Sequence, residues 1–138
     1  MVSALSHEQA QRMSDAAMRA ARSQGVAAVV SVVDAGGHLI SLQRMDGAAF
    51  GAVRFSERKA MSSAALGAPT GMLAKAVTAM PGLASAMIDG IAFVDGGLPV
   101  RFGKQLVGGI GVAGGMGGQD EAIAQAGLAV FEKEHSLA

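Results

Sequence analysis

Hydrophobic and polar positions follow a strand-like period in some segments of the chain and a helical period in others. Residues 26–33 form an apolar run rich in β-branched side chains, which is typical of a buried strand. Residues 34–37 have the composition of a tight turn, and residues 38–44 alternate between apolar and polar positions. The pattern therefore predicts an antiparallel hairpin in the first third of the chain.

Segments with a helical spacing of apolar residues come before and after this hairpin in the sequence. Ser6 and Gln9 have the spacing of a capping box, and Gly25 suits the position after a helix C-terminus, so the first helix is expected between them. Further helices are predicted on the same grounds at residues 49–66, 71–80, 83–88 and 119–135. Thr70 is expected to cap the helix that begins at residue 71.

Three further apolar segments are predicted to be strands, at residues 91–94, 98–102 and 105–112. Glycine-containing turns separate them, so neighbouring strands are expected to pair in antiparallel fashion. The predicted fold class is α+β, with one antiparallel sheet of about five strands and helices packed on it. The 138 residues are expected to form one domain, residues 1–138.

The composition narrows the range of partners. Eleven basic and eleven acidic side chains balance, so there is no electrostatic basis for binding nucleic acid or an anionic membrane. The sequence has no cysteine and no run of the roughly 20 apolar residues that a membrane helix needs. A soluble, cytoplasmic protein is expected. Because 51% of the residues are hydrophobic, we expect some apolar surface to meet another subunit.

One glycine-rich motif resembles part of a dinucleotide site but lacks the context. Residues 109–114 match G-x-G-x-x-G between a predicted strand and a predicted helix. A dinucleotide site also needs a strand after that helix, and none is predicted there. In addition, Asp120 and Glu121 would oppose a phosphate at the start of the helix. The glycines are therefore interpreted as positions of close strand–helix packing and of a tight turn.

Charged side chains after the hairpin are the candidates for chemistry. Arg44 and Asp46 either form a structural pair at the hairpin end, within one chain or across an interface, or form a site in which Arg44 binds a carboxylate and Asp46 orients it. Lys59 lies in an Ala-rich helical stretch, so partial burial is expected. Lys59 could be an anion anchor, a general acid or base, or half of a salt bridge, and the salt bridge is the favoured interpretation.

The three histidines are far apart in the sequence, and none has the spacing of an H-x-x-x-H metal site. No metal site is predicted on this basis. His38 begins a strand beside the Gly36-Gly37 turn, and its favoured interpretation is a structural or merely exposed residue.

Several motifs keep a recognisable order along the chain, at residues 32–39, 44–48, 59–60, 69–70, 96–99, 108–112 and 119–121. In this order they resemble the GlcG/HbpS-like haem-binding family, which includes the C-terminal domain of PduO-type proteins. The resemblance covers nearly the whole chain. It implies a profilin-like α-β-α sandwich and a homo-oligomer built from dimers up to an octamer. It also implies small-molecule binding near subunit interfaces, with haem as the ligand of some members.

The resemblance leaves three functional hypotheses open. The first is a small-molecule-binding protein or an enzyme of a catabolic pathway, such as aromatic catabolism. As an enzyme it would act on a small unsaturated carboxylate, as a hydrolase or an isomerase, without a required cofactor. The residues assigned to this site are catalytic Lys59 and Asp46, and substrate-binding Arg44, Gly96, Gly97 and His38.

The second hypothesis is a haem-binding or haem-sensing protein without catalysis. Haem iron takes His, Cys, Met or Tyr, and this sequence has neither Cys nor Tyr. His38 is the histidine inside a matched motif and is therefore the expected iron ligand. The third hypothesis is a structural oligomeric partner, in which Arg44, Asp46 and Lys59 form an interface network of salt bridges.

Overall fold

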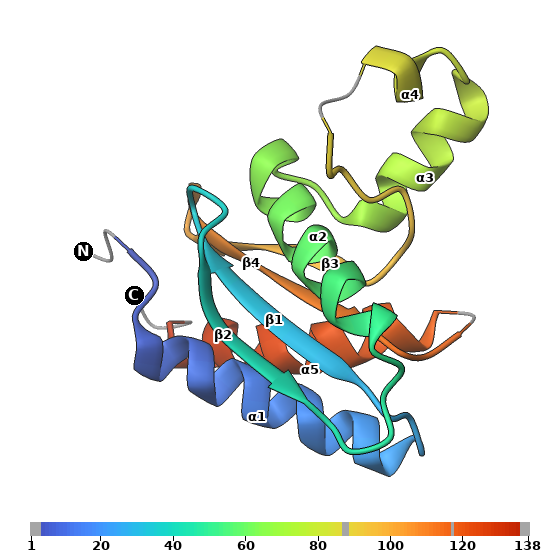
Figure 1. The fold of residues 1–138 in the computed structure, drawn as a ribbon. Coiled ribbons are helices and arrows are strands. Elements are labelled where there is room, and N and C mark those ends of the chain that lie inside the picture. The colour runs from blue at the N-terminus through green and yellow to red at the C-terminus, as the bar shows by residue number, and fades with distance from the viewer. Residues whose placement is uncertain (1–3, 87–88, 117, 136–138) are drawn as a thin grey trace.

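The computed structural model describes residues 4–86, 89–116 and 118–135, in which helices and strands alternate in short groups (Figure 1). The helices are α1 (His7–Ser23), α2 (Gly51–Leu66), α3 (Thr70–Ala79), α4 (Leu83–Ala86) and α5 (Gln119–Glu134). The strands are β1 (Val29–Asp34), β2 (Leu39–Arg44), β3 (Gly97–Phe102) and β4 (Gln105–Ala113). None of the helices within the described ranges is both long enough and apolar enough to cross a membrane.

The strands form one antiparallel sheet in the order β2-β1-β4-β3. Helices α1 and α5 cover one face of the sheet, α2 covers the other, and α3 and α4 extend beyond α2 (Figure 1). The chain is therefore an α-β-α sandwich, and the predicted α+β class is confirmed. The larger core lies on the α1 and α5 side, where the largest fully buried side chains include Met13, Ile110, Ile123 and Phe131.

Both signals predicted for the ends of α1 are confirmed. The Gln9 N–H donates to Ser6 Oγ at 3.1 Å, and the Ser6 N–H donates to Gln9 Oε1 at 2.8 Å, which completes the capping box. Gly25 has a φ of +70°, in the left-handed region that glycine reaches without a Cβ clash. The Val26 N–H then donates to Ala21 O, so the chain leaves the helix in a defined direction towards β1.

The described sheet has four strands, because the strand predicted at residues 91–94 does not form. The Ala92 N–H donates to Ser62 Oγ of α2 at 2.8 Å, so this segment is bound to the helix layer. Thr70 was also expected to cap α3, and this expectation is wrong: the N-cap residue is Pro69. The Thr70 hydroxyl instead accepts the Gly97 N–H at 2.9 Å. Hydroxyl side chains of the helix layer thus accept backbone N–H groups from the segment before β3 and from its first residue.

The interpretation of residues 109–114 as packing glycines is confirmed. Strand β4 runs through most of this motif and lies against α2. A Cβ on Gly109 would lie 2.4 Å from Ala60 O, and a Cβ on Gly111 would lie 2.2 Å from Ser56 O. Neither distance leaves room for a methyl group. The motif therefore sets the close approach of α2 to the sheet.

Asp34 stabilises the β1–β2 turn through its carboxylate. Its Oδ1 accepts the backbone N–H groups of His38 and Gly36, both at 2.9 Å. These hydrogen bonds, above all the one from His38, lower the pKa of Asp34 from its ordinary value. The resulting stabilisation is present above the pKa of Asp34 in the unfolded chain and is lost as the pH falls through the lower folded-state pKa.

We expect Asp34→Ala to lower the free energy of unfolding at neutral pH by about 1 kcal/mol, because two backbone donors lose their acceptor. The loss should begin to shrink as the pH falls below the ordinary pKa of aspartate, about 3.9, and should disappear below the lower folded-state pKa, where the folded wild type is also protonated. Urea unfolding of the variant and the wild type, at neutral pH and at a pH below the folded-state pKa of Asp34, measures this loss. Asp46→Ala is the control, because Asp46 is exposed and forms no salt bridge within the described ranges. Equal losses in both variants would contradict the role of Asp34.

Candidate functional site

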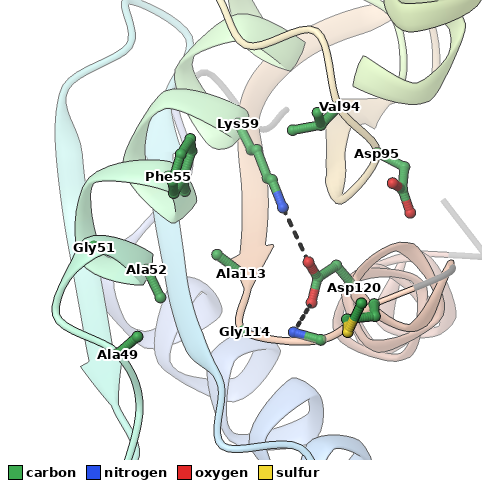
Figure 2. Close-up of a pocket in the computed structure, with 12 residues that line it drawn as sticks. Ala49, Gly51, Ala52, Phe55, Lys59, Val94, Asp95, Ala113, Gly114 and Asp120 are labelled. Carbon is green, nitrogen blue, oxygen red and sulfur yellow. Dashed lines mark hydrogen bonds and ion pairs between the residues drawn. The ribbon is translucent and has the colours of Figure 1, made fainter.

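A buried ion pair joins α2 to α5, which lie on opposite faces of the sheet. Lys59 of α2 donates from Nζ to Asp120 Oδ2 of α5 at 3.0 Å (Figure 2). The same Nζ donates to Val112 O of β4 at 2.9 Å. Both side chains are buried. The favoured interpretation of Lys59, half of a salt bridge, is therefore confirmed.

Asp120 also anchors the loop between β4 and α5. Its second oxygen, Oδ1, accepts the Gly115 N–H at 2.8 Å, so both carboxylate oxygens have donors. Asp120 lies in the first turn of α5, where the sequence places a favourable negative charge. Its pairing with Lys59, 61 residues away, was not predicted. The available signal was that a buried ammonium requires an anionic partner, but the sequence offers several acids and no means of choosing among them.

Gly96 and Gly97 lie against Lys59 itself. A Cβ on Gly97 would lie 2.3 Å from Lys59 O, and a Cβ on Gly96 would lie 2.9 Å from Lys59 Nζ and 2.6 Å from Val112 O. Gly96 also has a φ of +124°, which disfavours other residues. The two glycines thus let the backbone before β3 approach the ion pair. Their predicted contact with a substrate stays a prediction.

The ion pair forms part of the wall of a pocket of about 520 Å³, which we call the Lys59 pocket. In Figure 2, Ala49, Ala52 and Phe55 lie on the α2 side, and Val94 and Asp95 lie across from them. The remaining residues of the lining are Gly51, Ala113, Gly114, Gly115 and Met116. The lining is mostly apolar, and its charged members are Lys59, Asp95 and Asp120.

Two large apolar side chains of the Lys59 pocket are unusually exposed. Phe55 is 57% exposed, and Met116 is 83% exposed. The hydrophobic pattern of the sequence did not distinguish either residue. Aromatic and methionine side chains in a chain so rich in Ala and Gly are equally compatible with the core, and only their placement shows that they face solvent.

Arg44 and Asp46 lie away from the Lys59 pocket. They line a separate pocket of about 480 Å³, which we call the Arg44 pocket, together with Met18, Arg22, Gln43 and Met45. No salt bridge joins Arg44 to Asp46 within the described ranges, and Lys59 pairs with Asp120 of its own chain. Within a single chain, the described residues therefore do not form the predicted network of Arg44, Asp46 and Lys59. Their roles at a subunit interface stay predictions.

His38 is also separate from the Lys59 pocket. It lies at the β1–β2 turn with its side chain 83% exposed, and its Nδ1 lies 3.3 Å from Asp34 Oδ1. This position agrees with the favoured interpretation of an exposed residue. Among residues 4–86, 89–116 and 118–135, no group of three or more His, Asp or Glu side chains is arranged to hold a metal ion.

Taken together, the fold and the site define a small α-β-α sandwich protein with a mostly apolar pocket beside a buried lysine–aspartate pair. The chain belongs to the HbpS-like family: residues 5–129 match the family model described as haem degrading protein HbpS-like. The resemblance drawn from the sequence motifs is thereby confirmed.

Relatives found by structure and by sequence support the assignment. A double mutant of HbpS from Streptomyces reticuli is 38% identical to this chain, with a TM-score of 0.86, over 94% of this chain and 88% of that one. PduOC, solved as a haem complex, is 31% identical, with a TM-score of 0.84, over 91% of this chain and 94% of that one. A 15.0 kDa protein encoded in the dhaT–dhaS intergenic region of Citrobacter freundii is 33% identical, over 90% of this chain and 89% of its own length.

Proposed function

We propose that this protein binds haem in the Lys59 pocket. The observation that carries the proposal is the mostly apolar pocket of about 520 Å³, with an aromatic side chain, Phe55, exposed at its wall. Small-molecule sites are typically concave, mainly apolar and supplied with a few polar groups. Membership of the HbpS-like family and the similarity to PduOC, whose structure is a haem complex, support haem as the ligand.

The residues of the Lys59 pocket fit this group chemically. Phe55, Val94 and Ala113 provide apolar contacts for a macrocycle, and Met116 provides a thioether, one of the ligand types that haem iron accepts. When bound, haem would supply a redox-active iron.

The charges of the pocket argue against a small carboxylate substrate. The described lining carries one ammonium, Lys59, and two carboxylates, Asp95 and Asp120. The ammonium is already paired with Asp120, so a small anion would meet a lining of net negative charge. Asp46, the second predicted catalytic residue, lines the Arg44 pocket instead. The catalytic roles of Lys59 and Asp46 in hydrolysis or tautomerisation stay predictions, and haem binding is the function that the pocket favours.

A homo-oligomer is part of the proposal. Phe50 is 89% exposed and precedes α2 directly, close in sequence to the exposed Phe55. Large apolar side chains exposed near one another often mark a surface that meets a partner. We propose that copies of this chain associate, and solution mass should therefore be measured on the same samples as haem binding.

A haemin titration with two phenylalanine variants tests the proposal. We expect saturable, stoichiometric binding to the wild type, seen as a shift of the Soret band. Phe55→Ala should bind about tenfold more weakly, which corresponds to about 1.4 kcal/mol of lost aromatic contact. Phe50→Ala is the matched control, because Phe50 is exposed but does not line the Lys59 pocket.

Three results would argue against the proposal. No saturable Soret shift in a protein of intact mass would exclude haem as the ligand. Equal weakening in Phe55→Ala and Phe50→Ala would place haem outside the Lys59 pocket. Weakening in Phe50→Ala alone would place it on the neighbouring surface.

A further inference from the structure

We infer that Met116 is the side chain that ligates the haem iron in the Lys59 pocket. The inference rests on the proposed function, since it concerns the same pocket. The proposed function concerns contacts between haem and the apolar walls of the pocket. The inference adds which side chain binds the iron.

The backbone of Met116 is held in a defined position. Met116 lies in the loop between β4 and α5, and its N–H donates to Gln119 Oε1 at 3.0 Å. In return, the Gln119 N–H donates to Met116 O at 3.1 Å. The adjacent Gly115 N–H donates to Asp120 Oδ1 at 2.8 Å, and Asp120 is fixed by Lys59. The buried ion pair therefore positions the loop that carries the thioether.

The side chain of Met116, in contrast, has little packing of its own. It is 83% exposed, although methionine is among the residues most often buried. It also lines the Lys59 pocket. A thioether on a fixed backbone at the wall of a ligand-sized pocket is placed to contact whatever fills that pocket.

The chemistry of the other potential ligands singles out Met116. Haem iron accepts methionine sulfur and histidine nitrogen, and Met116 is the only methionine or histidine among the described residues that line the Lys59 pocket. His38 lies at the β1–β2 turn beside Asp34. His135 packs against Phe102 and Phe131, and its Nδ1 lies 2.8 Å from Phe131 O.

The test uses a leucine variant, because leucine keeps the volume and apolar character of methionine while removing the sulfur. Met116→Leu, Met72→Leu and wild type are titrated with haemin and examined by absorbance and near-infrared magnetic circular dichroism. Met72 is the matched control: it is 59% exposed and lines a neighbouring pocket, outside the Lys59 pocket. His38→Ala is included because His38 is the alternative ligand from the sequence motifs.

We expect the wild type and Met72→Leu to show the charge-transfer band typical of sulfur ligation to ferric haem. Met116→Leu should keep the haem stoichiometry but lose this band, and its reduction potential should fall, because methionine ligation raises the potential of haem iron. Binding by Met116→Leu with an unchanged spectrum and potential would overturn the inference while leaving haem binding intact. A wild-type spectrum that lacks the sulfur band, and that changes in His38→Ala but not in Met116→Leu, would assign the iron to His38 and also overturn the inference. Absence of haem binding in the wild type would overturn the proposed function, and the inference with it.

Discussion

Lys59→Met is expected to lower the free energy of unfolding by about 3–5 kcal/mol, as is typical when one partner of a buried ion pair is removed. The substitution keeps most of the side-chain length but removes the ammonium. Within the described residues, the buried carboxylate of Asp120 would be left with the Gly115 N–H as its hydrogen-bond donor. A buried charge without its counter-charge is costly because the low-dielectric interior replaces the solvation it has in water.

The double variant Lys59→Met/Asp120→Asn should recover a large part of this loss. It removes both charges, while the amide oxygen of Asn can still accept the Gly115 N–H. Urea unfolding of the wild type, the two single variants and the double variant forms a double-mutant cycle. Additive losses would show that the pair contributes no coupling energy and would contradict this account of the site.

The exposed ion pair between Arg12 and Glu134 is the control for the buried one. It joins α1 to α5 at the surface, with the Arg12 side chain 48% exposed. Arg12→Met should destabilise far less than Lys59→Met, because exposed ions stay solvated after their partner is lost. Equal effects at the two sites would mean that burial is not what makes the Lys59–Asp120 pair important.

Gly111→Ala is the second substitution with a large expected effect. Gly111 pairs with Ser31 of β1 and Gly97 of β3, in the middle of the sheet. An added Cβ would lie 2.2 Å from Ser56 O and 2.4 Å from Ala60 N, and both are backbone atoms of α2. Since neither atom can rotate away, α2 would have to shift, and we expect a loss of about 3 kcal/mol or more in the free energy of unfolding.

Gly82→Ala makes the same chemical change in open space, with no atom within 4 Å of the added Cβ. Its unfolding free energy should stay within about 0.5 kcal/mol of the wild type, as for most surface substitutions. Thermal or urea unfolding of the two variants measures the difference. A Gly111→Ala protein as stable as Gly82→Ala would show that α2 does not pack against β4 as closely as the structure places it.

Local interactions explain why much of the fold was predictable. The Ser6–Gln9 capping box and the Gly25 helix end depend on residues only a few positions apart, and both form as predicted. The β1–β2 hairpin likewise follows from an apolar run, a glycine turn and an alternating run. In such cases the partners of each backbone group are neighbours in the sequence.

The segment at residues 91–94 shows the limit of that reasoning. Its apolar composition is as suitable for a strand as that of β3, but a strand also needs a free sheet edge to bind. The hydroxyl of Ser62, 30 residues earlier, takes the Ala92 N–H instead. Thr70 is a similar case, because it binds the Gly97 N–H in place of capping its own helix. Long-range side-chain hydrogen bonds decided both outcomes.

The candidate site likewise has features that the sequence predicted and features that depend on the tertiary structure. The amino-acid sequence by itself determined the family, the α+β class and the expectation that Lys59 is buried and paired, because these follow from motif order, periodicity and neighbouring residue types. The tertiary structure alone decided that Asp120 is the partner, that Phe55 and Met116 line the pocket, and that Arg44 and Asp46 lie in another one. The physical reason is that a charge or an apolar side chain specifies what kind of environment it needs, whereas the packing of α2, β4 and α5 determines which residues supply it.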